Sequence, residues 1–161
     1  MKRMRVAIGA DHAAVALKDA LVKELRGANL PVEDLGTHST DSVDYPDFAR
    51  EVASRVAAGT ADRGILLCGT GIGMSIAANK VHGIRAAVCH DVTTARLARL
   101  HNDANVLCMG GRLIGLTLAS DIMQTWLATQ FEGGRHKGRI EKIHALETLE
   151  PSKAASKGTA R

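Results

Sequence analysis

A cysteine followed by a glycine-rich turn is the feature of this sequence that most clearly indicates chemistry. An apolar run ends at Cys68, and residues 69–73 then read Gly-Thr-Gly-Ile-Gly before a helical pattern begins. Glycine has no Cβ, so the backbone N–H groups of such a turn can approach a ligand closely. A turn that leads into a helix also gathers these N–H groups into an anion site. We therefore expect a base or nucleophile beside a site for negative charge.

The same residues have structural explanations. A free cysteine is often a small apolar residue of a buried strand; we assign that role to Cys89 and Cys108, while for Cys68 both interpretations stay open. A dinucleotide-binding turn is disfavoured, because its third glycine would fall on Met74 and the turn follows the third predicted strand instead of the first. No Gly-Lys-Ser/Thr follows, as a P-loop requires. A small phosphorylated or enolate-like ligand suits this compact turn better.

Two polar pairs lie where a predicted helix begins or ends. Asp11 and His12 follow the first predicted strand, where Asp is a good helix cap. His101 and Asn102 end the fourth predicted helix, where a cation favours the helix dipole and Asn is a common cap. Taken alone, each pair is better explained by capping than by catalysis, although capping does not explain the presence of His12.

Three arginines are candidate phosphate ligands. Arg135 and Arg139 are four residues apart and share one helical face, so two guanidiniums could grip one phosphate; a solvated basic face is the usual alternative. Arg112 follows Gly110 and Gly111 in a similar setting. None of the seven histidines has metal-ligand spacing, and neither HExxH nor CxxC occurs. Metal chemistry is therefore disfavoured, as is serine hydrolysis, which lacks its G-x-S-x-G motif.

These residues are spaced along an alternation of strands and helices. Short apolar runs predict five strands, at residues 5–10, 32–35, 64–68, 85–89 and 105–109. Helical spacing of apolar residues predicts six helices. They lie at residues 17–25, at 48–56, at 74–80, after a cap at Asp91 or Thr93, around Leu118, Ile122 and Trp126, and from His136 to Leu149. The second of them has Asp44 as its expected cap and Pro46 in its first turn. This order predicts a parallel sheet covered on both faces. Ligands of such sheets bind beyond the C-terminal ends of the strands.

Composition limits the class of protein. The 161 residues suffice for one domain, which we place at residues 1–149, followed by a disordered basic tail at 150–161. Residues 1–150 hold 18 basic and 17 acidic side chains, so the body of the chain gives no indication of nucleic-acid binding. No segment is apolar enough to span a bilayer. Three cysteines without a signal peptide predict reduced thiols and a cytoplasmic location.

Seven segments together match one family in the order in which they occur. They are residues 9–12 (Gly-Ala-Asp-His), 44–46 (Asp-Tyr-Pro), 68–73 (Cys-Gly-Thr-Gly-Ile-Gly), 77–80 (Ala-Ala-Asn-Lys), 83–86 (Gly-Ile-Arg-Ala), 101–107 (His-Asn-Asp-Ala-Asn-Val-Leu) and 132–136 (Glu-Gly-Gly-Arg-His). With these motifs the chain resembles the ribose-5-phosphate isomerase B family, which includes allose-6-phosphate and galactose-6-phosphate isomerases. One branch of that family uses a Glu just after the glycine turn in place of the cysteine. That position is Met74 here, so the resemblance is to the cysteine branch.

The resemblance implies an aldose–ketose isomerase of the pentose phosphate pathway that works through an enediolate without a metal or another cofactor. Cys68 would move the proton between C1 and C2, and Thr70 would place or protonate the sugar oxygens. His101 would aid opening of the furanose ring, with Asp11 as a polar partner. The amides of the turn would hold the enediolate oxygen, among them those of Gly69, Gly71 and Gly73.

The resemblance also implies a substrate-binding set and an assembly. His12, Arg135 and Arg139 would grip the phosphate. Three further residues, Tyr45, Asn102 and Arg112, would line the pocket. The family builds its site across a homodimer, so that His101, Asn102 and Arg112 would come from the other subunit; a tetramer is a further possibility.

We therefore expect a three-layer α/β/α sandwich with a Rossmann-like, five-stranded parallel sheet. The expected activity is interconversion of ribose 5-phosphate and ribulose 5-phosphate, with neither nucleic acid nor a membrane as partner. Allose-6-phosphate or galactose-6-phosphate isomerisation is the alternative within the class. A non-catalytic sugar-phosphate binding protein is the alternative from another class, followed by a dinucleotide-binding oxidoreductase. Pure binding needs no base, and the combination of Cys68, Thr70 and His101 argues against it.

Overall fold

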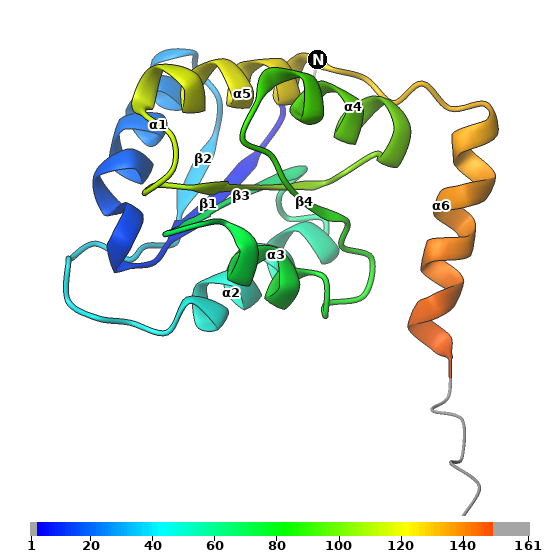
Figure 1. Cartoon of the computed structure of the whole chain (residues 1–161), viewed down its shortest axis with the longest axis horizontal. Coiled ribbons are helices and arrows are strands. Elements are labelled where there is room, and N and C mark those ends of the chain that lie inside the picture. Colours follow the sequence, from blue (N-terminus) through cyan, green and yellow to red (C-terminus); the bar gives the residue numbers. More distant parts are fainter. Residues whose placement is uncertain (1–2, 150–161) are drawn as a thin grey trace, which may run out of the picture.

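A five-stranded parallel sheet forms the centre of the protein in the computed structural model, which describes residues 3–149 (Figure 1). The strands lie in the order β2-β1-β3-β5-β4, and every neighbouring pair is parallel. Their bounds are Val6–Ala10 (β1), Val32–Asp34 (β2), Arg63–Cys68 (β3), Ala86–Val88 (β4) and Val106–Gly110 (β5). The predicted three-layer architecture is confirmed, and each predicted strand is present to within one residue at either end.

Helices cover both faces of this sheet, which explains its continuous apolar strands. On one face lie α1 (Val15–Gly27), α4 (Val92–Asn102) and α5 (Leu116–Ala128); on the other lie α2 (Tyr45–Ala57) and α3 (Ile72–Ala78) (Figure 1). Alternate residues of an inner strand enter the two cores. In β3, Ile65 and Leu67 belong to the core under α1, α4 and α5, while Leu66 and Cys68 belong to the core under α2 and α3. A strand buried on both faces has no need of polar alternation.

The ends of the helices agree in part with the predictions. Asp91 caps α4 as predicted, because its carboxylate accepts the Thr94 N–H at 2.7 Å. Asp44 occupies the cap position of α2, but its side chain makes no capping hydrogen bond. Leu118, Ile122 and Trp126 all lie in α5, as their helical spacing predicts. Leu118 is nevertheless exposed, because the buried stripe of α5 is centred on the neighbouring helical row. The third helix begins at Ile72, inside the glycine turn, and not at Met74.

The sixth helix, α6 (Arg135–Ala145), stands beside α4 and apart from the layers that cover the sheet (Figure 1). Its buried residues are His136 and Ile140, whereas Ile143 is exposed. Short 3-10 turns precede α1 at His12–Ala14 and follow α6 at Leu146–Thr148. The predicted tail at 150–161 lies outside the described residues. Within residues 3–149 no helix combines the length and the apolar character that crossing a membrane requires.

A buried lysine fixes the segment that follows β2 against the end of β1. The Lys18 ammonium is fully buried, and its Nζ lies 2.7 Å from Asp34 Oδ2. The other oxygen of Asp34 accepts the Gly36 N–H at 3.0 Å, and the Gly36 carbonyl accepts the Ala10 N–H. The chain is thus held in place immediately before Asp11, where the first polar residues beyond the sheet begin.

Candidate active site

A cavity of about 460 Å³ opens beyond the C-terminal end of β3. This is the edge at which a parallel α/β sheet is expected to bind its ligand. Seven of the predicted site residues line it: Asp11, Tyr45, Cys68, Gly69, Thr70, Gly73 and Arg112. Two residues without a predicted role, Ile72 and Ile76, also line it and are more than half exposed. Their separation by four positions, which places them on one face of α3, is the sequence signal that could have identified them.

The thiol of Cys68 is buried in the wall of this cavity. Its Sγ accepts the backbone N–H of Gly71 at 3.1 Å, a bond that becomes charge-assisted when the sulfur is a thiolate. The other two cysteines have no such surroundings. Burial raises the pKa of the Cys89 thiol to about 11, and full burial also raises the pKa of Cys108 well above its usual value. Both therefore remain thiols at neutral pH, in keeping with their prediction as small apolar strand residues.

Three amides of the glycine turn are free to bind an oxyanion. The Gly71 N–H donates to the Cys68 sulfur, and the Ile72 N–H donates to Thr70 Oγ1 at 3.3 Å. The remaining amides of the turn, those of Gly69, Thr70 and Gly73, donate no hydrogen bond within residues 3–149. The prediction that the turn amides hold the ligand stays a prediction, and these three amides are the ones without an internal partner.

Two of the turn glycines are also required by packing. Gly71 has φ = +78°, and a Cβ added there would lie 2.9 Å from the Met109 carbonyl carbon. At Gly73 an added Cβ would lie 2.6 Å from Cζ of Tyr45, whose ring packs directly on the start of α3. The absence of these two side chains therefore lets the turn approach β5 and lets Tyr45 reach the cavity.

Arg112 lies in the same cavity as Cys68 of its own chain, which differs from its expected origin in a second subunit. Its guanidinium packs on Gly69, with Nη1 3.3 Å from where a Cβ would stand. Its backbone N–H donates to the Gly69 carbonyl at 3.1 Å. The reason is the strand order: β5 pairs with β3, with Gly110 in register with Cys68, so the turns after both strands are neighbours.

Asp11 and His12 are held by backbone groups at the end of β1. The Asp11 carboxylate accepts the Ala13 N–H at 2.9 Å and caps the short 3-10 turn, so its capping role and its position in the cavity coexist. His12 Nδ1 accepts the Val43 N–H at 3.2 Å. The proton of a neutral His12 is therefore on Nε2, which can donate to a ligand.

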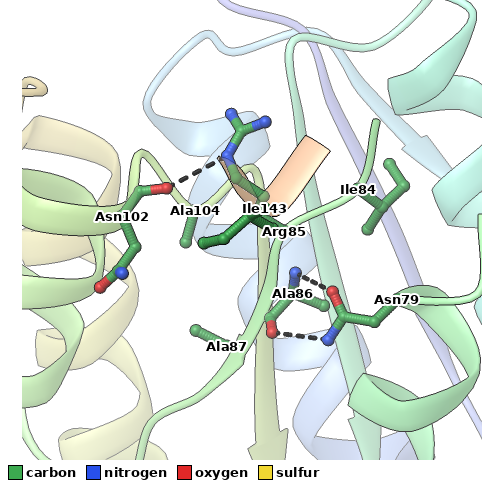
Figure 2. Close-up of a pocket in the computed structure, with 8 residues that line it drawn as sticks. All are labelled: Asn79, Ile84, Arg85, Ala86, Ala87, Asn102, Ala104 and Ile143. Atoms are coloured by element: carbon green, nitrogen blue, oxygen red, sulfur yellow. Dashed lines mark hydrogen bonds between the residues drawn. The ribbon is translucent and has the colours of Figure 1, made fainter. Parts of the chain in front are cut away.

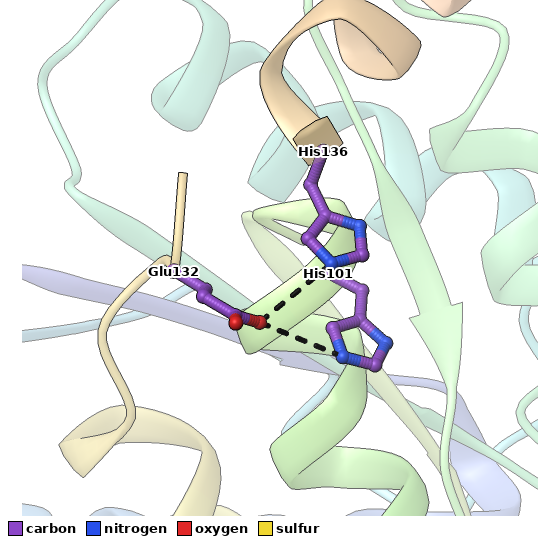
Figure 3. A group of neighbouring side chains, drawn as sticks. All are labelled: His101, Glu132 and His136. Carbon is purple, nitrogen blue, oxygen red and sulfur yellow. Dashed lines mark ion pairs between the residues drawn. The ribbon is translucent and has the colours of Figure 1, made fainter. Parts of the chain in front are cut away.

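His101 and Asn102 lie away from the Cys68 cavity within one chain. Asn102 lines a separate pocket of about 220 Å³ (Figure 2), and its carbonyl accepts from Arg85 Nε at 3.1 Å. The His101 ring stacks on His136 with centroids 4.4 Å apart (Figure 3). Glu132 Oε2 lies 3.8 Å from His101 Nε2 and 3.6 Å from His136 Nε2.

The predicted phosphate ligands are not assembled within one chain. Arg135 and Arg139 are exposed on α6. Figure 1 shows α6 on the opposite side of the molecule from the start of α1, next to which His12 lies. These three residues do not meet within one chain, because α6 stands beside α4 and does not fold back over the end of β1. Their joint binding of the phosphate stays a prediction.

One group of side chains within residues 3–149 has the composition of a metal site. The ligand atoms of His101, Glu132 and His136 all lie within 4.8 Å of one another. A metal lies in the plane of each imidazole that binds it, along the lone pair of the nitrogen. The two rings are stacked only 12° from parallel, so their lone pairs do not converge on a common point. As arranged, the group does not fit a metal ion.

Comparison with known proteins agrees with the resemblance noted in the sequence. The family model described as Ribose/Galactose Isomerase matches residues 6–143. Ribose-5-phosphate isomerase B of Escherichia coli K12 is 50% identical over 143 residues, which cover 89% of this chain and 96% of that protein. D-erythrulose-4-phosphate isomerase of Pectobacterium atrosepticum is 47% identical and covers 91% and 97%. The solved structure of Clostridium thermocellum ribose-5-phosphate isomerase B matches with a TM-score of 0.89 and 53% identity, covering 89% of this chain and 97% of that one.

Proposed function

The chain belongs to the ribose/galactose isomerase family, and we propose that it interconverts ribose 5-phosphate and ribulose 5-phosphate through an enediolate with Cys68 as the base. The observation that supports this most directly is the position of the thiol. Cys68 Sγ lies in the wall of a cavity, accepts a backbone N–H, and is next to three amides that have no other acceptor in residues 3–149.

The reaction requires one proton to move between two neighbouring carbons. The Cys68 thiolate takes the proton from C2 of the open-chain aldose, the C–H electron pair forms the C1=C2 bond, and the carbonyl electrons pass to O1. The same sulfur then returns the proton to C1, while the hydroxyl proton on O2 is transferred to O1 and C2 becomes the ketone. Thr70 aids the transfer between the oxygens. This role is supported by the position of Thr70 in the cavity wall, where its Oγ1 accepts the Ile72 N–H.

Stabilisation of the enediolate is the larger part of the barrier reduction. An α-hydroxy carbonyl proton is far too weakly acidic for a free thiolate, so the oxyanion must be bound as it forms. Fixed N–H donors are worth about 2.7–4 kcal/mol each in comparable sites, and a positioned acid or base adds about 10²–10⁴-fold. The amides of Gly69, Thr70 and Gly73 supply such donors without a metal ion or an organic cofactor.

A homodimer that shares its sites is part of this proposal. The predicted phosphate ligands Arg135 and Arg139 lie on α6, away from His12 of the same chain, so α6 of a second copy would have to bring them to the cavity. The exposed apolar residues of this region, Ile143 and Leu146, support such an interface. The cavity itself is open to solvent along Ile72 and Ile76, where a partner would close it. We also propose a cytoplasmic location, which the three unpaired cysteines support.

Two alternatives are distinguished by substrate and by turnover. The first alternative is a different sugar-phosphate substrate. A relative is named D-erythrulose-4-phosphate isomerase, and the family that the sequence resembles includes isomerases of allose 6-phosphate and galactose 6-phosphate. A sugar-phosphate binding protein without turnover is the other. Its site would have no use for a buried thiol that receives a backbone N–H.

The test is isomerase activity after removal of each thiol in turn. Cys68→Ala should abolish turnover of ribose 5-phosphate while largely preserving affinity for a non-reacting sugar phosphate, because the amides and arginines remain. Cys89→Ala, which removes a buried thiol outside the cavity, is the matched control and should keep its activity. Turnover retained in Cys68→Ala would remove the thiol from the mechanism. Kinetics of the wild-type protein on the four sugar phosphates would rank the substrates.

A further inference from the structure

The side chains of His101, Glu132 and His136 come from three parts of the chain and meet in one group (Figure 3). Of these, only His101 has an expected role in the reaction, in the opening of the sugar ring. His101 ends α4, Glu132 lies in the connection that precedes α6, and His136 lies in the first turn of α6. The two imidazoles are stacked with centroids 4.4 Å apart. The Glu132 carboxylate lies beside Nε2 of both rings, at 3.8 Å and 3.6 Å.

The backbone holds this group in place. The Glu132 N–H donates to the Leu100 carbonyl at 3.1 Å, which ties the connection to the last turn of α4. Gly133 and Gly134 have φ values of +74° and +56°, a conformation that glycine adopts without strain. They reverse the chain so that Glu132 and His136, four residues apart, both face His101. The group is therefore not a chance encounter of exposed side chains.

The charges of the group favour one distribution of protons. Burial lowers the pKa of His136, and the neighbouring His101, Arg135 and Arg139 lower it further, while Glu132 opposes them. His136 is therefore uncharged at neutral pH and presents a flat, neutral surface to the ring above it. The Glu132 carboxylate, which lies beside Nε2 of both rings, is the acidic member of the group. Nδ1 of His101 makes no hydrogen bond to any residue in the range 3–149.

We propose that Glu132 and His136 are positioning residues for His101: Glu132 retains the proton on Nε2, His136 fixes the plane of the ring, and Nδ1–H is left as the donor to the sugar. The proposal rests on the proposed isomerase function and on the role in ring opening that the family resemblance implies for His101. In that step the Nδ1 proton passes to the ring oxygen of the furanose as the electron pair of the C1–O bond moves to that oxygen. The C1 hydroxyl loses its proton to Asp11 and becomes the aldehyde on which Cys68 acts. Because His101 lies away from the cavity of its own chain, it would act on the sugar held by the second subunit of the proposed homodimer.

A double-mutant cycle on ribose 5-phosphate turnover tests whether Glu132 acts through His101. His101→Asn should lower kcat about 100-fold, the lower end of the contribution of a positioned acid. Glu132→Gln should lower kcat about 10-fold with KM within about twofold, because an orienting partner is worth less than the acid itself. The double variant should be no slower than His101→Asn alone. Glu141→Gln, on the exposed surface of α6, is the matched control and should change neither constant.

Two replacements of His136, one aromatic and one small, test whether its ring fixes the plane of the His101 ring. His136→Phe keeps an aromatic surface beneath His101 and should retain kcat to within about threefold, whereas His136→Ala removes it and should lower kcat about 10-fold. Thermal melts of all variants show whether each is folded. Because Glu132 is more than half exposed, we expect its variants to fold. Glu132→Ala repeats the cycle if the Gln variant melts early.

Each contrary result has a separate meaning. An unchanged kcat in folded Glu132→Gln overturns the positioning role, as does a further loss of kcat when Glu132→Gln is added to His101→Asn. A rise of KM alone would assign Glu132 to substrate binding and also overturn it. Wild-type kcat in His101→Asn would remove the proposed role of His101, and with it the premise. A wild-type protein without turnover would remove the proposed function itself.

Discussion

Adding a single methyl group at Gly73 should separate activity from stability. The Cβ of Gly73→Ala would lie 2.6 Å from Cζ and 3.0 Å from Oη of Tyr45. Carbon atoms in contact prefer about 3.5–4.0 Å, so the ring must withdraw by about 1 Å. Tyr45 is 40% exposed, and the clashing atoms are the free end of its side chain. The ring can therefore move without any displacement of the backbone.

The expected change in the free energy of unfolding is small. Alanine is favoured over glycine within a helix by about 1 kcal/mol, and Gly73 lies within α3. Overpacking costs about 1–3 kcal/mol, and a mobile ring places this case at the lower end. The two effects nearly cancel, so we expect a net change within about 1 kcal/mol of zero. The kcat/KM should nevertheless fall by about 10–100-fold, because a shift of about 1 Å in a residue that lines the site is costly for catalysis.

Gly71→Ala is the informative comparison. Its φ of +78° disfavours a side chain by about 1–2 kcal/mol, and its Cβ would meet the backbone of Met109, which cannot swing away. We expect a loss of about 2–5 kcal/mol in stability. Urea unfolding with linear extrapolation measures the stabilities, and steady-state kinetics measure activity. A Gly73→Ala protein that is destabilised by more than about 2 kcal/mol, or that keeps wild-type kcat/KM, would refute the assigned contact between Gly73 and Tyr45.

Four further outcomes are expected. Lys18→Met should lower the free energy of unfolding by about 2–4 kcal/mol by leaving Asp34 without its buried partner, whereas Lys23→Met on the exposed face of α1 should not, as urea titration would show. Burial alone would raise the pKa of Asp34, but hydrogen bonds from Lys18 and a backbone N–H lower it overall. The ionised carboxylate therefore stabilises the fold at neutral pH, and this contribution to the free energy of unfolding is lost as the pH falls below about 4. A pH dependence of stability that persists unchanged in Asp34→Asn would contradict this. Iodoacetamide at pH 8 should label Cys68 before Cys89 and Cys108, because burial raises the pKa of those two thiols. Equal labelling of all three cysteines in a peptide mass spectrum would argue against a difference in reactivity. Arg135→Ala should raise KM about 10-fold or more with little change in kcat, as loss of a charged hydrogen bond to phosphate requires, and an unchanged KM would exclude Arg135 from the phosphate site.

The architecture was predictable because the spacing of apolar residues along the chain indicates the order of strands and helices. Continuous apolar runs such as residues 64–68 are typical of strands buried on both faces, and such strands belong to parallel sheets with helical connections. The same reasoning placed ligand-binding residues at the ends of strands, and the cavity does lie there, lined by Asp11, Cys68 and Arg112. These predictions used only residues that are close together in the sequence. They succeeded for the features that such residues decide, namely the strands and the polar residues that follow them. It could not say that Leu118 is exposed, because spacing defines a stripe along a helix but not which edge of that stripe faces the core.

The sequence by itself determined the strands, the helices, the thiol before a glycine turn and the family they resemble, since each depends on residues that are close together in the chain. The tertiary structure alone decided that Arg112 lies over Gly69, because that contact depends on β5 lying beside β3. It also decided that Glu132 meets His101 and that α6 stands away from His12. Distances between residues that are remote in sequence follow from strand order and helix packing, which no local pattern of residues specifies.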